Sequence, residues 1–534
     1  MVVPGSSIPV ASNRREWLLL IAVVIAYLIA RILLIPNRPE FTHAFSHDSG
    51  YLADVAANLL SGKGYVDDAL WLVFLQPPSV PMPYHNANPL FPTLTAALTI
   101  ATGNVFQSGF LVGILSSAIL FVALFALVRP YVGRPAHAMG LAFAVVLFPP
   151  VLHESLLYLT DALCTALLVA SVAVLQRARS AKGDLACGVL LGLAWLTRAA
   201  TILAVPAIIV YLLLRYPISA ALRKLAIVTV AALIVASPWL IHTKAVWGSY
   251  LRSDSEFSIV QDLAAEKSHG YSVMRYWHST EPPPPLSAFV REAPFGFVRH
   301  TVAGAANVAR RTLSWWFLRS VPTFVLLTIG VLLWSFGRRR VLSPEALALA
   351  VFAAATIVVL AIRGDSFEER YVDTLTVMFV LIAALGCWRV WQIASTPLRR
   401  GLVAAALIVV WGVIVPLKIR TMYADVYSLD VSLVAYRAAA AEVNRNFARG
   451  TPVVVGMTPY FYSIETSAVS LNFPDAPDDY LLKYMERYGA QYVFLTNDEI
   501  DYWRPAWRSA ASLPAGLRLA GRVGDAFVLG KTAR

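Results

Sequence analysis

The chain has 534 residues, of which 58% are hydrophobic and 14% charged, and its mean hydropathy is +0.63. Because soluble domains carry about 25% charged residues, this composition excludes an ordinary soluble protein and indicates a chain that crosses a membrane several times. The formal net charge is +12. Since the basic residues cluster in short segments between apolar runs, this charge is interpreted as a topology signal, and no nucleic-acid partner is expected.

The first apolar run, residues 17–36, follows Arg14 and Arg15 and lacks a small-residue cleavage site, so we interpret it as a retained membrane anchor. About a dozen residues beyond it, the segment His47–Tyr51 contains Asp48. A carboxylate at that place lies at the lipid–water boundary, where it could act as a base on a substrate whose other end is in the bilayer. The alternative is an ordinary solvated loop acid.

The segment 37–107, called here the first outer loop, contains further polar candidates. Asp67 and Asp68 follow the Gly62–Tyr65 turn and are expected to be solvated. His85 precedes residues 89–102, which are interpreted as a helix lying at the membrane interface, with an additional span as the alternative. His85 either caps this helix or lines the same cavity as Asp48.

Further apolar runs are long enough, at about 20 residues, to cross a bilayer. Together with the first run they give about eleven predicted transmembrane helices: residues 17–36, 108–128, 136–151, 155–176, 184–198, 200–215, 224–242, 321–337, 345–362, 371–389 and 401–418.

Basic residues mark the same side of the membrane at every second connection. With a cytoplasmic N-terminus the six inner segments carry Arg14/Arg15, Arg129/Arg134, Arg177/Arg179/Lys182, Arg215/Arg223/Lys224, Arg338–Arg340 and Arg389/Arg399/Arg400. This agrees with the excess of Lys and Arg in cytoplasmic loops. The outer segments are then the first outer loop, the large outer loop (residues 243–320) and everything after residue 418.

Two charged residues interrupt apolar runs near the predicted outer face. Asp161 lies near the outer end of its span, where an acid normally faces a cavity or a partner, although it or Thr160 could instead cap a helix. Arg198 lies at the turn between two apolar segments and opposes the positive-inside bias. It therefore indicates an anionic partner, with snorkelling to lipid headgroups as the alternative.

The C-terminal region, residues 419–534, has a different pattern from the membrane module, residues 1–418. Short β-branched or aromatic runs at 453–456, 492–495 and 526–529 predict strands, and Asp478–Tyr488 has helical periodicity. We expect a small extracytoplasmic α/β domain, called here the C-terminal module.

Several motifs occur in an order that resembles a known family. They are His47–Tyr51, Ala57–Tyr65, His85–Pro92, Gly192–Arg198 and Glu369–Tyr371. The chain is similar to the GT-C superfamily of integral-membrane glycosyltransferases, and most of all to the branch of protein O-mannosyltransferases and lipid A aminoarabinose transferases. The likeness covers residues 17–390 and implies a mostly helical, multi-pass protein of the bacterial inner membrane.

The resemblance implies an inverting transfer of a sugar from a polyprenyl-phosphate donor to a lipid, glycan or protein acceptor. Asp48 would be the general base, and Arg198, Arg370 and Lys63 would stabilise the leaving phosphate. Tyr371, His85 and Asp161 are the further substrate-binding candidates. No metal and no cofactor are expected, and the partners are the donor, the acceptor and membrane lipids.

One position departs from the family's pattern. Many relatives carry two adjacent acids where this chain has Asp48-Ser49, which leaves Asp161 or Asp54 as a source of a second carboxylate. A transporter or flippase of lipid-linked glycans and a noncatalytic scaffold are the competing classes. Neither paired repeats nor broken helices in matching halves, which are typical of transporters, are found.

Overall fold

The computed structural model describes residues 14–84, 88–251, 277–319, 344–364, 372–393 and 415–532, together with Val260, Leu263 and residues 396–397. The predicted span 321–337 and most of the span 401–418 lie outside these residues. So do three candidate site residues, His85, Arg370 and Tyr371.

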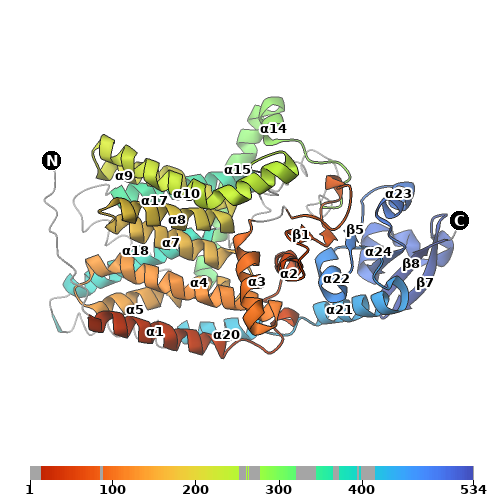
Figure 1. Ribbon diagram of the computed structural model, residues 1–534, viewed down its shortest axis with the longest axis horizontal. Helices are drawn as coiled ribbons and strands as arrows, with labels where there is room; N and C mark the ends of the chain where they lie inside the picture. The colour runs from red at the N-terminus through yellow and green to blue at the C-terminus, as the bar shows by residue number, and fades with distance from the viewer. Residues whose placement is uncertain are drawn as a thin grey trace.

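A bundle of helices fills one end of the molecule and the C-terminal module fills the other, with the first outer loop between them (Figure 1). The helices of the bundle are α1 (Arg14–Ile32), α4 (Val105–Val128), α5 (Pro135–Val146), α6 (Pro149–Glu154), α7 (Asp161–Arg177), α8 (Ala181–Thr197), α9 (Val205–Arg215), α10 (Ile218–Trp247), α14 (Leu286–Glu292), α15 (Pro294–Arg319), α17 (Pro344–Arg363), α18 (Asp373–Ile393) and α20 (Val415–Val426).

Two helices in the described part of the chain are long and apolar enough to cross a membrane by length and composition. They are α4 with the turn that follows it, Val105–Tyr131, and α10. Several other apolar helices are shorter than that criterion requires. The predicted count of eleven spans therefore stays a prediction.

Three predicted spans differ from the helices that form. The span 136–151 is divided, because α5 ends at Val146 and a new helix begins at Pro149, whose missing N–H suits a first helical position. The helix predicted over 155–176 begins only at Asp161. The span predicted over 200–215 starts as a 3₁₀ helix and becomes α-helical at Val205.

Close helix packing in the bundle depends on glycine. A Cβ atom at Gly188 of α8 would lie 2.4 Å from the carbonyl oxygen of Val228 of α10, and one at Gly192 would lie 2.8 Å from that of Ala232. Hydrogen at these two positions lets the helix backbones touch. Within the bundle α4 packs against α1, α5 and α7, and α7 packs against α8.

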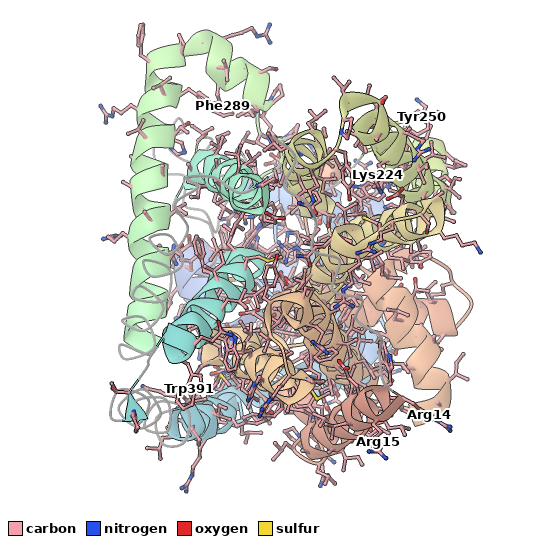
Figure 2. All side chains as sticks on the ribbon, turned by 90° about the vertical axis from the view of Figure 1, so that its left-hand side faces the viewer. Arg14, Arg15, Lys224, Tyr250, Phe289 and Trp391 are labelled. Atoms are coloured by element: carbon pink, nitrogen blue, oxygen red, sulfur yellow. The ribbon has the colours of Figure 1, made fainter. Side chains whose placement is uncertain are left out.

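The end of the bundle remote from the C-terminal module carries many basic side chains, and Figure 2 looks onto this end. Arg129 forms an ion pair of 2.7 Å with Glu16, which joins the end of α4 to α1. Lys224 lies buried between α8 and α10 and contacts the Asp184 carboxylate at 2.8 Å. Several of the residues that define the predicted inner face thus gather on one side of the bundle.

The C-terminal module contains a six-stranded sheet with the order β2-β5-β4-β6-β8-β7. Strands β2, β5, β4 and β6 are parallel, and β8 is antiparallel to both β6 and β7. The elements after residue 430 are α21 (Val431–Val443), β4 (Val453–Val455), α22 (Pro459–Thr466), β5 (Ser470–Asn472), α23 (Asp478–Tyr488), β6 (Tyr492–Thr496), α24 (Asn497–Trp503), β7 (Leu517–Val523) and β8 (Ala526–Lys531). The three predicted strands and the helix 478–488 are all present.

The edge strand β2, Ala69–Leu70, comes from the first outer loop. The predicted division assigned these residues to the membrane module, whereas the sheet joins them to the C-terminal module. The other elements of the loop are η1 (Pro39–Phe41), α2 (His47–Leu60), β1 (Val66–Asp67), η2 (Val73–Leu75), β3 (Met82–Pro83) and α3 (Leu90–Thr102). In Figure 1 α3 runs across the long axis of the bundle, as an interfacial helix would.

The glycine contact between α8 and α10 gives the first testable prediction. Gly188→Ala should lower the free energy of unfolding by about 1–3 kcal/mol, because the added methyl group forces the two helices apart. The matched control is Gly140→Ala in α5, where an added Cβ meets no atom within 4 Å. Thermal unfolding in detergent checks both, and equal melting temperatures would contradict the close packing.

Candidate functional site

Asp48 lies in the first turn of α2, and the sequence around it explains why the helix begins there. The Ser46 N–H donates to Oγ of Ser49 at 2.9 Å, which closes a capping box around the helix start. The positive end of the helix dipole favours a carboxylate in this turn. Asp48 is partly exposed.

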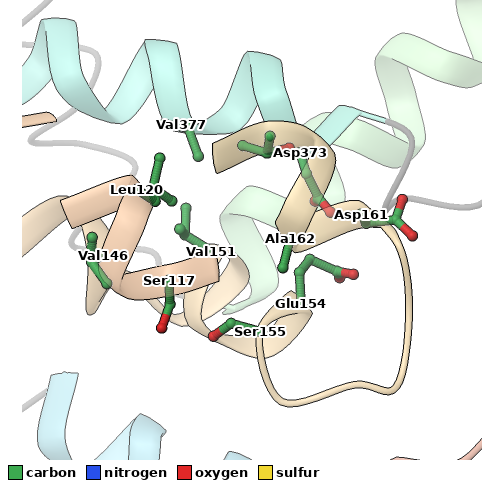
Figure 3. Close-up of a pocket in the computed structure, with 11 residues that line it drawn as sticks. Ser117, Leu120, Val146, Val151, Glu154, Ser155, Asp161, Ala162, Asp373 and Val377 are labelled. Atoms are coloured by element: carbon green, nitrogen blue, oxygen red, sulfur yellow. The ribbon is translucent and has the colours of Figure 1, made fainter. Parts of the chain in front are cut away.

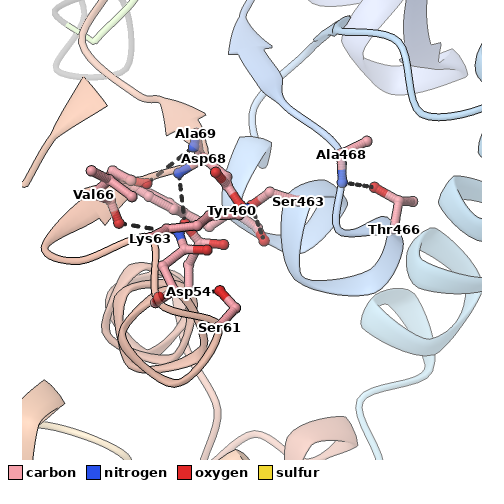
Figure 4. A network of polar contacts seen from close by, with 12 residues as sticks. Asp54, Ser61, Lys63, Val66, Asp68, Ala69, Tyr460, Ser463, Thr466 and Ala468 are labelled. Carbon is pink, nitrogen blue, oxygen red and sulfur yellow. Dashed lines mark hydrogen bonds and ion pairs between the residues drawn. The ribbon is translucent and has the colours of Figure 1, made fainter. Parts of the chain in front are cut away.

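Three aspartates of the first outer loop lie close together, as Figure 4 shows in part: Asp54 of α2, and Asp67 and Asp68 beyond its end. Oδ2 of Asp54 accepts the backbone N–H of Asp68 at 2.8 Å, and Nζ of Lys63 lies 2.7 Å from Oδ2 of Asp68. Asp67 is fully buried and Asp68 is 3% exposed. The expectation that these two acids are solvated is therefore wrong, because the C-terminal module covers the turn that carries them.

Burial changes the protonation of this cluster. Desolvation, followed by the nearby Asp68 charge, raises the pKa of Asp54 to about 7. Desolvation and the Asp54 charge hold the pKa of Asp67 well above its ordinary value. A hydrogen bond joins the Asp54 and Asp67 side chains. It follows that a proton shared by these two carboxyl groups belongs to the folded state near neutral pH.

Lys63 forms an ion pair within this cluster of aspartates. Its ammonium group pairs with Asp68, so one positive charge is matched by one carboxylate before any ligand arrives. The Lys63 side chain is 43% exposed and the Asp68 side chain is 4% exposed. A role for Lys63 toward a phosphate would have to compete with this ion pair.

Asp161 and Arg198 meet at the end of the bundle that faces the first outer loop. Asp161 begins α7 and Arg198 ends α8, and the Arg198 guanidinium donates to the Asp161 carboxylate. Thr160 makes no side-chain capping bond at the start of α7. Each of these two residues therefore has the other as one of its partners.

Two further acids, Glu154 and Asp373, lie beside the Asp161–Arg198 pair, and Figure 3 shows their carboxyl groups near that of Asp161. Glu154 ends α6 and Asp373 begins α18, and Oε1 of Glu154 contacts Nδ1 of His153 at 3.1 Å. Both acids are at least 95% buried, and Glu154 Oε2 and Asp373 Oδ2 find no hydrogen-bond partner in the described part of the chain. In the described part of the chain, the carboxyl groups of Asp161, Glu154 and Asp373 therefore lie near the Arg198 guanidinium.

A small pocket lies beside these acids. It is lined by Ser117, Leu120, Val146, Val151, Glu154, Ser155, Asp161, Ala162, Thr165, Asp373 and Val377. The buried Arg31 of α1 donates to one of these lining residues, to the backbone oxygen and Oγ of Ser155, both at 3.1 Å, and also to the Tyr27 hydroxyl at 2.7 Å. Arg31 of α1 and Arg198 of α8 therefore both bring positive charge to this part of the bundle.

Sequence reasoning missed Arg31, Glu154 and Asp373, although a signal existed for each. All three are charged residues inside or at the end of an apolar run, which is costly unless a partner or cavity receives them. Among the described residues, no group of three or more His, Cys, Asp or Glu side chains is placed to hold a metal ion.

The structure brings several predicted motifs together. Val55 of α2, Tyr84 and Trp239 form a buried cluster, against which Trp195 and Leu196 pack. Since Leu196 precedes Arg198 by two residues, α2 and the Arg198 turn share one apolar contact. The side-chain amide of Asn88 also donates to the Trp195 carbonyl, which ties the His85–Pro92 segment to the same turn.

Comparisons with known proteins agree with this arrangement. Residues 84–242 match the sequence profile of the family described as dolichyl-phosphate-mannose-protein mannosyltransferase. No curated protein sequence matches the chain significantly.

Solved structures resemble the fold over most of the chain. ArnT from Cupriavidus metallidurans bound to undecaprenyl phosphate has 13% identity and a TM-score of 0.60, covering 98% of this chain and 99% of its own. The apo oligosaccharyltransferase of Archaeoglobus fulgidus has 13% identity and a TM-score of 0.61, covering 90% and 70%. AglB from the same organism, with an inhibitory peptide and a dolichol-phosphate, has 13% identity and a TM-score of 0.58, covering 92% and 70%. At this identity the likeness shows the fold.

The buried acids at Arg198 generate a stability prediction. Arg198→Gln should lower the free energy of unfolding by about 3 kcal/mol or more, since it leaves three buried carboxyl groups without their guanidinium. Asp161→Asn should cost less, because Glu154 and Asp373 remain beside the arginine. Lys483→Gln, which breaks an exposed ion pair with Asp479, is the control and should change little. Chemical unfolding in detergent ranks the three, and a larger loss for Asp161→Asn would contradict the charge count.

The shared proton of Asp54 and Asp67 generates a pH prediction. Between about pH 4 and pH 7 the folded state holds a proton that the unfolded chain releases, so the free energy of unfolding should fall as the pH rises. Asp67→Asn keeps a hydrogen-bond donor and removes one titration. Its melting temperature should therefore fall less from pH 5 to pH 8 than that of the wild type. Asp498→Asn, at an exposed acid, should behave as wild type; identical pH profiles for all three would count against the shared proton.

Proposed function

We propose that this chain, a membrane glycosyltransferase of the GT-C type, transfers a sugar from a polyprenyl-phosphate donor to an acceptor hydroxyl at the outer face of the membrane. The observation that carries the proposal is the placement of Asp48. It begins a capped helix that packs, through the Val55 cluster, against the turn that ends in Arg198. Asp48, the proposed base, and Arg198, a cation at the end of α8, are thereby held on neighbouring elements. The apolar helices beside them suit a lipid chain.

The donor class is supported by the solved relatives. ArnT was solved with undecaprenyl phosphate and AglB with a dolichol-phosphate, which are the phosphates that remain when a lipid-linked sugar is transferred. The matched family is likewise described by a dolichyl-phosphate sugar. The gathering of basic residues at the remote end of the bundle supports a cytoplasmic location for that end and an outer location for Asp48.

In the proposed reaction the Asp48 carboxylate takes the proton of the acceptor hydroxyl while that oxygen attacks the anomeric carbon. The bond between the anomeric carbon and the phosphate oxygen breaks, so the configuration inverts and a polyprenyl monophosphate leaves. Fixed positive charge must stabilise this phosphate, and Arg198 is the described residue proposed for that task. Arg370 and Lys63 are the further candidates, with Tyr371, His85 and Asp161 proposed to bind substrate.

Acceptor choice is proposed to rest on the C-terminal module and the large outer loop. His278 of this loop is buried against the module and bonds through Nδ1 to the Phe473 carbonyl oxygen at 2.6 Å. Asp475 donates its N–H to the His278 carbonyl oxygen at 2.8 Å. The two parts proposed to select the acceptor therefore contact each other directly.

Replacement of the proposed base tests the function. Asp48→Asn should lower turnover at least about 100-fold, because the amide cannot take the acceptor proton. The test uses membranes of a strain that lacks the gene, supplied with wild type or variant at equal protein levels. Mass spectrometry follows surface glycans and lipids that become one sugar heavier.

Asp425→Asn, at an exposed acid of α20, is the matched control and should act as wild type. Equal product from Asp48→Asn and wild type would show that Asp48 is not the base. A wild-type protein that changes no glycan or lipid would favour a transporter or scaffold over a transferase.

A further inference from the structure

The C-terminal module touches the helix of the proposed base at its first turns. A Cβ atom at Gly50 of α2 would lie 2.8 Å from Cβ of Tyr460 in α22, so the backbones approach closely. The rings of Tyr51 and Tyr460 are 5.5 Å apart, and those of Phe45 and Phe461 are 6.0 Å apart. Because Gly50 follows Asp48 by two residues, this contact falls on the turn that carries the proposed base.

The contacting helix α22 is itself fixed from both sides. The Tyr460 hydroxyl donates to Oδ2 of Asp67 at 3.3 Å, which ties α22 to the buried acids of the first outer loop. Oγ of Ser470 donates to the Pro459 carbonyl oxygen at 2.7 Å, which ties the start of α22 to β5. Ser470 in turn pairs with Ala69 of β2. The loop, the sheet and α22 therefore form one connected unit.

A second contact holds the chain that leads into α2. Arg437 of α21 is 5% exposed and pairs with Glu465 at 2.7 Å. Its Nη1 donates to the carbonyl oxygen of Glu40 at 3.3 Å, and its guanidinium lies 4.4 Å from the centre of the Phe41 ring. A planar guanidinium that is paired and stacked in this way is a rigid connection. The segment before Asp48 is thus held by the same module as the segment after it.

From these contacts we infer that the C-terminal module positions the base: Tyr460 is a positioning residue that acts on Asp48 through Gly50 and α2. The inference rests on the proposed function of Asp48. A displacement of about 1 Å at a reacting group can cost on the order of 100-fold in rate, so a helix held by backbone contact has catalytic value. In this reading the module is needed for the chemical step, whatever acceptor it also selects.

The two roles of the module are separable by kinetics. A positioning contact changes kcat for every acceptor and leaves the KM for the donor nearly unchanged, because substrate still binds and only the base is misplaced. A contact that served acceptor binding alone would raise the KM for the acceptor. A contact that served folding alone would lower the amount of active enzyme and the melting temperature together.

The test uses the full-length protein in nanodiscs, with undecaprenyl-phosphate-linked mannose as the donor probe, water as the acceptor that takes the sugar, and release of undecaprenyl phosphate as the readout. Gly50→Ala should lower kcat about 10-fold or more, since its methyl group pushes against Cβ of Tyr460. Tyr460→Phe should lower kcat about threefold or more by removing the bond to Asp67. Both should keep the donor KM within about twofold.

Matched controls come from the same helix and from the bundle. Tyr462→Phe removes a buried hydroxyl of α22 that has no hydrogen-bond partner among the described residues, and Gly140→Ala adds a methyl group in open space. Both should keep wild-type kcat. A loss in Tyr462→Phe equal to that in Tyr460→Phe would overturn the inference, because the effect would then come from general loosening of α22.

A double variant separates this inference from the proposed function. If Gly50 acts through Asp48, then Gly50→Ala should not lower the residual rate of Asp48→Asn any further. An equal fold-loss in both backgrounds would overturn the positioning role while the base assignment stands. Wild-type turnover of Asp48→Asn alone would instead overturn the base assignment, and the positioning role with it. Tyr460→Phe in the Asp48→Asn background repeats the test without the added methyl group.

Discussion

The parallel pairing of β2 with β5 is the constraint on which the rest of the outer half depends. Ala69 and Leu70 lie against Ser470 and Leu471, so the first outer loop completes a sheet that the last quarter of the chain builds. This pairing places the C-terminal module over the loop, so the turn that carries Asp67 and Asp68 is buried away from water. The burial of Asp67 and the contact of α22 with α2 both follow from it. The module and the membrane bundle are joined through this loop, which explains how the module can influence chemistry at the membrane.

Acidic residues are buried in two clusters, one in the first outer loop and one at the ends of the helices. In each cluster a different set of contacts offsets the free-energy cost of burying a carboxyl group. In the first outer loop, Asp54 and Asp67 share a proton while Asp68 pairs with Lys63. At the ends of the helices, Glu154 contacts His153 while Asp161 pairs with Arg198. Removing a partner in either place leaves charge in a poorly solvated site, which costs more than breaking an exposed pair.

The local sequence pattern predicts those elements whose signal lies in their own residues. The helix Asp478–Tyr488 and the strand at Val453–Val455 follow from periodicity and β-branched runs, and Arg198 follows from a charge between apolar segments. The strand β2 has only two residues and no such signal, because a partner about 400 residues away creates it. The solvated reading of Asp67 and Asp68 was wrong for the same reason. Glu154 and Asp373, which line the same pocket, likewise come from ends of helices that are far apart in the chain.

The order in which the chain is synthesised also determines when the sheet can form. The first outer loop is synthesised long before Ser470, and it contains an edge strand whose partner does not yet exist. Until Ser470 and Leu471 have been synthesised, Ala69 and Leu70 lack their strand partner and the buried aspartates lack their cover. The complete sheet can therefore form only after β8, the last of its strands in the chain, has been synthesised. A chain that stops short would leave a membrane bundle with an open, exposed strand edge, which is the kind of surface that cellular quality control removes.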